Sequence, residues 1–270
     1  MQSRFRIQDL SPNRIISAYL RRLKYFHHLY AWKKTQSKPK NPVMALLDIK
    51  DRHANERCFI IGNGPSLREM DLGILSDEFT FGLNRIYLMF NKLGFETSYY
   101  VAMNELVIQQ SIDSILQVDA PKFLNWSTRG LFPKWNNVNF LLEKFKPHFS
   151  KDLRKGVWGG ATVTFVAMQI AFYLGFNEVI LIGVDHRFHT RGTPHKVVEG
   201  KGVDQNHFDP QYFPPGTKWQ LPDLRSSEYA YRLAKEAFEA DNRRILDATL
   251  DGDLSVFPKV EFNEVLMKKK

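Results

Sequence analysis

The sequence contains a single cysteine, Cys58, among its 270 residues. One cysteine forms no disulfide within the chain, so a hydrophobic core must hold the fold, and a reducing, cytoplasmic compartment is expected. Residues 1–13 lack the apolar run of a signal peptide, because two arginines and an aspartate interrupt them. The uncharged stretch 156–177 contains glycines, threonines and a glutamine, so we expect a buried helix there rather than a membrane span.

Acidic residues are scarce near the amino terminus. Residues 1–57 hold 13 Lys/Arg against 4 Asp/Glu, which accounts for the whole net charge of +9 and leaves residues 58–270 neutral. A core that binds nucleic acid is expected to carry its own basic face, so we exclude nucleic acid as a partner. The net positive charge therefore belongs to the N-terminal arm and not to the core.

A helix is predicted over residues 12–34, where apolar and aromatic residues recur at helical spacing between basic ones. Such a helix suits peripheral contact with an anionic membrane, packing on the protein's own core, or contact with a second subunit in a homo-oligomer. The sequence leaves these alternatives open. We divide the chain into a basic helical arm and linker (1–56), a Rossmann-like nucleotide-binding catalytic domain (57–260) and a tail (261–270).

A glycine-rich loop follows the first predicted strand of that domain. Cys58–Ile61 reads as a buried strand, and it ends on a loop formed by Gly62, Asn63, Gly64, Pro65 and Ser66. Glycines allow a ligand to approach the backbone, and Ser66 is placed to cap a short helix whose N–H groups point at an anion. The loop lacks the lysine of Walker A and the third glycine of the dinucleotide fingerprint.

Further strands are predicted at 79–83, 99–103, 122–125, 178–184 and 244–249, alternating with helices. This order predicts an α/β fold: a Rossmann-like open parallel sheet with helices on both faces, an N-terminal helical arm and a long lid loop. Asn63, Asn84 and Asn104 each follow a strand, where ligands bind in such sheets. Asparagine also terminates strands for purely structural reasons.

Two later segments complete the predicted site. Gly160 and Thr162 open the helix 163–174 with bare amides and a hydroxyl suited to a phosphate. Asp185 follows the strand 178–184. Residues 186–225, which carry four of the eight histidines, are expected to be a lid without regular structure, and residues 126–149 an irregular insertion or lid.

Two motifs carry a resemblance to known enzymes. Residues 61–67 with Asn84–Tyr87, and residues 174–185, resemble motifs of the bacterial lipooligosaccharide sialyltransferases and of the wider MptE-like domain family. That family takes in motility-accessory-factor glycosyltransferases and an archaeal 6-hydroxymethylpterin diphosphokinase. The resemblance covers about residues 57–260, and the segments 206–210 and 247–258 favour the MptE-like branch.

The resemblance implies a nucleotide site made by residues 62–66 with Asn84, Asn104, Gly160, Thr162 and Asp185. It makes His207 the general base, which suits a histidine near neutral pH. The tyrosine pair of the sialyltransferases has no clear counterpart, which leaves Tyr212, Lys196 and Arg191 as candidates for that role.

The implied function is transfer of a sialic acid-like sugar from a CMP- or other nucleotide-activated donor to a surface glycan or glycolipid, with no cofactor. The alternative is an ATP-dependent pyrophosphokinase, for which Asp185 with Asp204 or Asp209 would hold Mg²⁺. A third reading is a non-catalytic nucleotide-binding scaffold. His186, His189 and His195 lack a zinc-like spacing, and Asp251–Asp253 is better explained as a turn.

Overall fold

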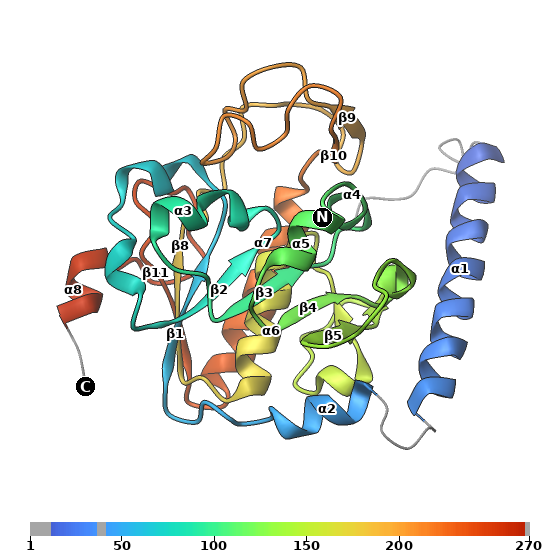
Figure 1. Cartoon of the computed structure of the whole chain (residues 1–270), viewed down its shortest axis with the longest axis horizontal. Coiled ribbons are helices and arrows are strands. Elements are labelled where there is room, and N and C mark those ends of the chain that lie inside the picture. The colour runs from blue at the N-terminus through green and yellow to red at the C-terminus, as the bar shows by residue number, and fades with distance from the viewer. Residues whose placement is uncertain (1–11, 37–41, 268–270) are drawn as a thin grey trace, which may run out of the picture.

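The computed structural model describes residues 12–36 and 42–267 and centres on a seven-stranded sheet (Figure 1). Every neighbouring pair of strands in it is parallel. The strands, in spatial order, are β11 (Arg244–Asp247), β8 (Glu178–Ile182), β1 (Arg57–Ile61), β2 (Phe79–Leu83), β3 (Tyr99–Ala102), β4 (Lys122–Asn125) and β5 (Val138–Leu141). The strand order reverses between β1 and β8, which is where an open α/β sheet leaves a crevice.

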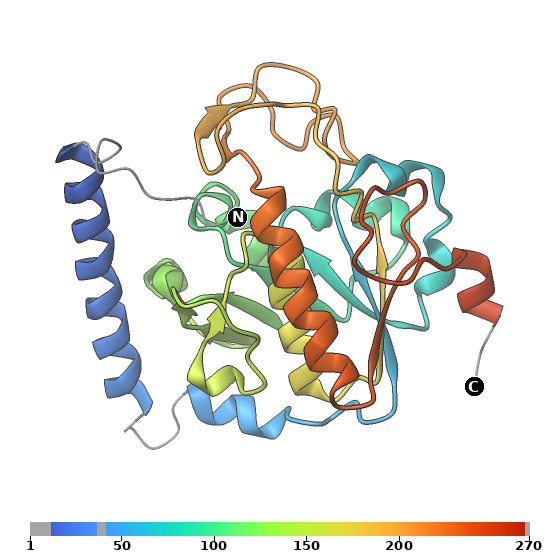
Figure 2. The ribbon, with the colours of Figure 1, turned by 180° about the vertical axis from the view of Figure 1, so that it is seen from behind.

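Helices cover both faces of the sheet. One face carries α2 (Pro42–Asp48), α6 (Val163–Leu174) and α7 (Leu224–Glu239), seen from their own side in Figure 2. The other face carries α3 (Phe90–Leu93), α4 (Glu105–Gln110), α5 (Ile112–Gln117) and α8 (Phe262–Met267), together with short 3₁₀ turns. This arrangement confirms the predicted fold class.

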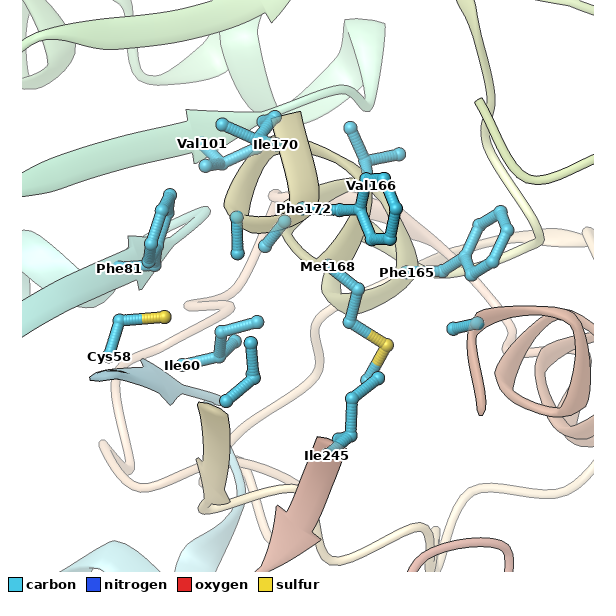
Figure 3. Close-up of a cluster of buried hydrophobic side chains, with 14 of the residues drawn as sticks. Cys58, Ile60, Phe81, Val101, Phe165, Val166, Met168, Ile170, Phe172 and Ile245 are labelled. Carbon is cyan, nitrogen blue, oxygen red and sulfur yellow. The ribbon is translucent and has the colours of Figure 1, made fainter. Parts of the chain in front are cut away.

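The strand sequences explain why both faces are covered. Cys58 and Ile60 of β1 point into the cluster shared with α6, while Phe59 and Ile61 point to the opposite face. Figure 3 shows the first cluster, with Ile170 of α6 packed near the sheet. A strand buried on both faces is apolar along its buried length, and β1 and β8 have that pattern after their first residues, Arg57 and Glu178.

Helix α6 occupies the uncharged stretch 156–177. Thr162 caps its start and Gly175, with φ of 99°, ends it. The helix is buried over almost its whole length against the sheet and α7. Within the described residues, no helix is long and apolar enough to cross a membrane.

Several predicted boundaries were wrong. The segment 126–149, expected to be irregular, contributes β5 to the main sheet and β6 (Glu143–Lys144), which pairs with β7 (Val157–Trp158). The connection from β3 to β4 contains two short helices, α4 and α5, which meet at Ser111, and α2 ends at Asp48, well before β1. The lid contains an antiparallel hairpin of β9 (Val197–Glu199) and β10 (Lys218–Gln220).

Helix α1 (Pro12–Gln36) stands beside the β5 edge of the sheet (Figure 1). Trp32 is 2% exposed and packs edge-to-face on Trp126, whose indole N–H donates to the His28 carbonyl. Arg129 also reaches the His28 ring. The carboxy-terminal half of α1 is therefore docked on the body of the protein.

Candidate active site at the carboxyl edge of the sheet

A cavity of about 820 Å³ lies at the carboxyl ends of the strands, beneath the lid. Its wall brings together most of the residues predicted to bind the nucleotide or to act as the base; of that set, Pro65 and Ser66 do not line it. The predicted residues that line it are Gly62, Asn63, Gly64, Asn84, Asn104, Gly160, Thr162, Asp185 and His207.

Only the Asn63 amide of the glycine loop after β1 lacks an acceptor among the described residues, so the expected cradle of several open amides is not formed. The Gly62 N–H donates to Ile182 O at 2.8 Å, the Gly64 N–H to Gly183 O at 2.9 Å, and the Ser66 N–H to the Asp185 carboxylate at 3.1 Å. Because these amides already have acceptors, they are not available to an anion.

The two glycines serve close packing against the end of β8. A Cβ on Gly62 would lie 2.2 Å from Gly183 O, and a Cβ on Gly64 would lie 1.7 Å from Asp185 Oδ2. No side chain fits at either position, so the loop can contain only glycine there. The sequence signal for a close approach was correct, and the partner is a neighbouring strand.

Asp185 joins the two strand ends. Its carboxylate accepts the Ser66 N–H and the Ser66 hydroxyl, the latter at 2.8 Å. Burial raises the pKa of Asp185, and the hydrogen bonds from Ser66 only partly offset that cost. Ser66 is buried and lies inside the short 3₁₀ turn Pro65–Glu69, so the expected helix cap is absent: Gly64 is the capping residue.

The second glycine turn, before α6, is different. Gly160 and Ala161 both have φ near +60°, and the Thr162 N–H donates to Gly159 O, which defines a tight turn. The Thr162 hydroxyl accepts the Thr164 N–H and lies 3.4 Å from the Tyr231 hydroxyl. Within the described chain, the amides of Gly160, Ala161 and Val163 have no protein acceptor, and all three residues line the cavity.

His207 lies in the cavity wall contributed by the lid. Its Nδ1 is 2.9 Å from Asp204 Oδ2, and its ring stacks on Tyr212 at 4.0 Å between centroids. Burial alone would raise the pKa of Asp204, but the hydrogen bond and charge of His207, with backbone amides, hold that pKa below its ordinary value. An aspartate on Nδ1 fixes the ring's orientation and leaves Nε2 for a substrate.

Tyr212 is buried beneath the His207 ring. Its hydroxyl accepts the Arg85 N–H at 3.2 Å, and burial raises its pKa. Of the three residues considered for the missing tyrosine pair, only Tyr212 lines the cavity; Lys196 and Arg191 are exposed on the lid.

The asparagines at the strand ends divide into two kinds. The Asn104 side-chain oxygen caps α4, and its amide donates to Gln220 of the lid, so this residue has a structural role in the cavity wall. The side-chain oxygens of Asn63 and Asn84 are buried and have no hydrogen-bond partner among the residues that the structure describes. A buried orphan acceptor is costly, so these two atoms are suited to donors on a ligand.

Two polar residues near the strand ends, Asn125 and Glu143, also line the cavity and were not predicted from the sequence. Asn125 ends β4, and its amide donates to Glu143 Oε2 at 2.9 Å. Desolvation raises the pKa of Glu143, with a further contribution from the charge of Glu105, while the Asn125 bond acts in the opposite sense. Asn125 continues the pattern of an asparagine after each strand, so the sequence contained a signal for it. Glu143 was missed because β6, in the segment expected to be irregular, was not recognised.

The acidic residues proposed for Mg²⁺ are already engaged. Both oxygens of Asp185 bind Ser66, while Asp204 binds His207 and the Asn206 N–H. In the described part of the chain, no three His, Cys, Asp or Glu side chains gather as a metal site. Asp209 caps the turn at Gln211 and does not line the cavity.

The lid is fixed to the body by hydrogen bonds on two sides. Arg68 donates to the carbonyls of His207 and Phe208, and the Phe208 N–H donates to Asn63 O. Gln110 of α4 exchanges two hydrogen bonds with Lys218 of β10. These contacts hold His207 over the glycine loop.

Comparison with known proteins places the chain in a family. The MAf glycosyltransferase from Magnetospirillum magneticum AMB-1 aligns with a TM-score of 0.49 at 13% identity, over 85% of this chain and 38% of that one. The sialyltransferase CstII from Campylobacter jejuni, solved with the substrate analogue cytidine-5'-monophosphate, aligns with a TM-score of 0.47 at 13% identity, over 78% and 86% of the two chains. No curated protein matches significantly. The profile of the family described as 6-hydroxymethylpterin diphosphokinase MptE-like matches residues 28–191, more than half of the chain, so the protein belongs to the MptE-like family.

Proposed function

We propose that this protein is a glycosyltransferase that uses a nucleotide-activated sugar. The observation that carries the proposal is one cavity lined by both His207, whose Nδ1 is held by Asp204, and a turn with open amides. The first is suited to accept a proton, and the second is suited to a departing phosphate.

The residues divide the reaction between them. His207 Nε2 takes the proton of the acceptor hydroxyl while the acceptor oxygen bonds to the sugar's anomeric carbon. The bond from that carbon to the phosphate oxygen breaks, and the amides of Gly160, Ala161 and Val163 stabilise the nucleotide that leaves. Asn63 and Asn84 accept hydrogen bonds from its ribose or base.

The finer proposal concerns the donor. A CMP-linked, sialic acid-like sugar carries a carboxylate, which needs a cationic partner. Arg187 is the one Lys or Arg among the described residues that line the cavity. We therefore expect Arg187→Ala to slow transfer from an acidic donor and to leave transfer from a neutral donor unchanged. Transfer rates measured with both kinds of donor test the assignment.

The second candidate is an ATP-dependent 6-hydroxymethylpterin diphosphokinase, the activity in the family's description. It would use the same cavity with Mg²⁺. The engaged state of Asp185 and Asp204 favours the glycosyltransferase, because neither carboxylate has an oxygen without a protein partner.

Thermal shift with CMP, CDP, UDP and ATP, each with and without Mg²⁺, separates the two. Stabilisation by a pyrimidine nucleotide without metal supports the glycosyltransferase, and stabilisation by ATP only with Mg²⁺ supports the pyrophosphokinase. His207→Ala should then abolish transfer and retain nucleotide binding. His189→Ala is the matched control, because His189 is an exposed histidine of the same lid and does not line the cavity.

A further inference from the structure

Helix α1 has two faces with different surroundings. Its inward face holds Trp32 and His28, which contact Trp126 and Arg129 of the body. Its outward face, read from the described side chains, exposes Leu23, Phe26 and Tyr30, at 48%, 60% and 68%. These three residues recur at spacings of three and four, so they form one stripe along the helix.

Basic residues border this apolar stripe. Arg22, Lys33 and Lys34 are exposed on the same outward side of the helix. The 25 residues of α1 include six Lys/Arg and no Asp or Glu. An apolar stripe bordered by cations is the pattern of a helix that lies in a membrane interface.

A second exposed aromatic side chain lies against the inward face of α1. Phe145, in the loop after β6 (Glu143–Lys144), is 58% exposed, and its ring lies 4.6 Å from that of Tyr25 on α1. Tyr25 is seven residues before Trp32 and therefore lies on the same side of the helix as Trp32. Phe145 therefore belongs to the contact between α1 and the body, and the outward stripe consists of α1 residues.

We propose that the outward face of α1 docks on a membrane surface that contains anionic lipids. Leu23, Phe26 and Tyr30 enter the headgroup region, and the neighbouring Lys and Arg side chains pair with lipid phosphates. A second copy of this chain fits the face less well. Two such helices would bring cations together in a contact to which α1 contributes no acidic residue.

The position of this face relates it to the candidate active site. A smaller cavity of about 310 Å³ lies between α1 and the body, lined on one side by Tyr25, His28 and Phe145. Glu105, Asn125 and Glu143 line both this cavity and the large one. Membrane docking would therefore hold the large cavity close to the lipid surface.

Vesicle co-sedimentation of the full chain tests the proposal. The chain should sediment with vesicles of phosphatidylcholine mixed with phosphatidylglycerol, and not with phosphatidylcholine alone. Lys and Arg side chains near an anionic surface each strengthen binding, so K33E with K34E should weaken binding by about tenfold or more. F26S with Y30S should weaken it by a similar factor.

Matched controls keep the test specific. Ile74→Ser removes an apolar side chain that is 46% exposed elsewhere on the surface, and Lys201→Glu reverses an exposed charge on the lid; neither should alter vesicle binding. Unchanged thermal unfolding of F26S/Y30S shows that a loss of binding is not misfolding. Equal sedimentation with both kinds of vesicle, or retained binding by both double variants, overturns the proposal. So does a concentration-dependent dimer in analytical ultracentrifugation that F26S/Y30S abolishes, because the face would then be a contact between copies.

Discussion

Two glycine-rich turns at the same cavity look alike in the sequence and differ in the structure. After β1, the amides of Gly62, Gly64 and Ser66 are all bonded to the end of β8. Before α6, the amides of Gly160, Ala161 and Val163 have no acceptor among the described residues. Glycine marks a place where something approaches the backbone closely, and it does not say whether that is a ligand or a strand.

The largest effect is expected at the first turn. Gly62→Ala places a Cβ 2.2 Å from a backbone oxygen that cannot move aside, so we expect a loss of at least about 3 kcal/mol in the free energy of unfolding, measured by urea denaturation. Gly64→Ala is the milder variant, because it meets a side-chain oxygen first. Gly130→Ala is the control, since nothing lies within 4 Å of its added Cβ. Equal stabilities of the Gly62 and Gly130 variants would refute the packing role.

The next largest loss of stability is expected when Asp185 is replaced. Asp185→Ala leaves the Ser66 N–H and hydroxyl buried without an acceptor, which should cost about 2 kcal/mol at neutral pH. Asp185→Asn keeps an acceptor for the N–H and should cost much less.

The same residue makes a pH prediction. Because its folded pKa is raised, the folded protein binds this proton more tightly than the unfolded chain does. The stability that the protonated Asp185 contributes is therefore fully present below the unfolded pKa of about 3.9. It is lost as the pH rises through the pKa of Asp185 in the folded protein. Wild type should lose stability relative to Asp185→Asn between pH 4 and pH 7 in urea titrations. A difference that does not vary with pH would show that this carboxyl is not perturbed.

Thr162→Val tests the second turn. Loss of the capping hydroxyl should cost about 1 kcal/mol of stability and should also weaken nucleotide binding, whereas Thr162→Ser should retain both. Ser66→Ala is the contrasting variant: it should lower stability without changing nucleotide affinity in calorimetric titrations. If Ser66→Ala weakens nucleotide binding and Thr162→Val does not, the roles assigned to the two turns are reversed.

The smallest expected effect is a gain in stability on replacing Ala161. Ala161 holds a left-handed φ of 61° that glycine adopts without strain. Ala161→Gly should raise the free energy of unfolding by up to about 1 kcal/mol, part of which is offset by the greater freedom of glycine in the unfolded chain. A decrease would mean that the Ala161 methyl makes contacts that outweigh the strain.

The sequence predicted the parallel sheet and the edge at which the polar residues meet, because apolar strands and their polar ends have clear periodic signals. From the strand ends it placed Gly62 and Asn84 at one edge of the sheet, and through the family resemblance it added His207; all three line one cavity although they are far apart in the chain. It missed β5, which lies among aromatic residues and turn formers in a segment without strict alternation. It also missed that Asp204 orients His207 and that Asp185 engages Ser66, because such pairings depend on how the lid and β8 meet the loop.

The central claim is that a nucleotide's phosphate binds at the turn before α6 and not at the loop after β1. Amide ¹H–¹⁵N shifts during titration with the nucleotide that stabilises the protein measure this directly. The account predicts large, saturating shifts at Gly160, Ala161 and Val163, with Gly62, Gly64 and Ser66 retaining their hydrogen-bonded shifts and slow hydrogen exchange. Large shifts at Gly62, Gly64 and Ser66 with none before α6 would contradict it.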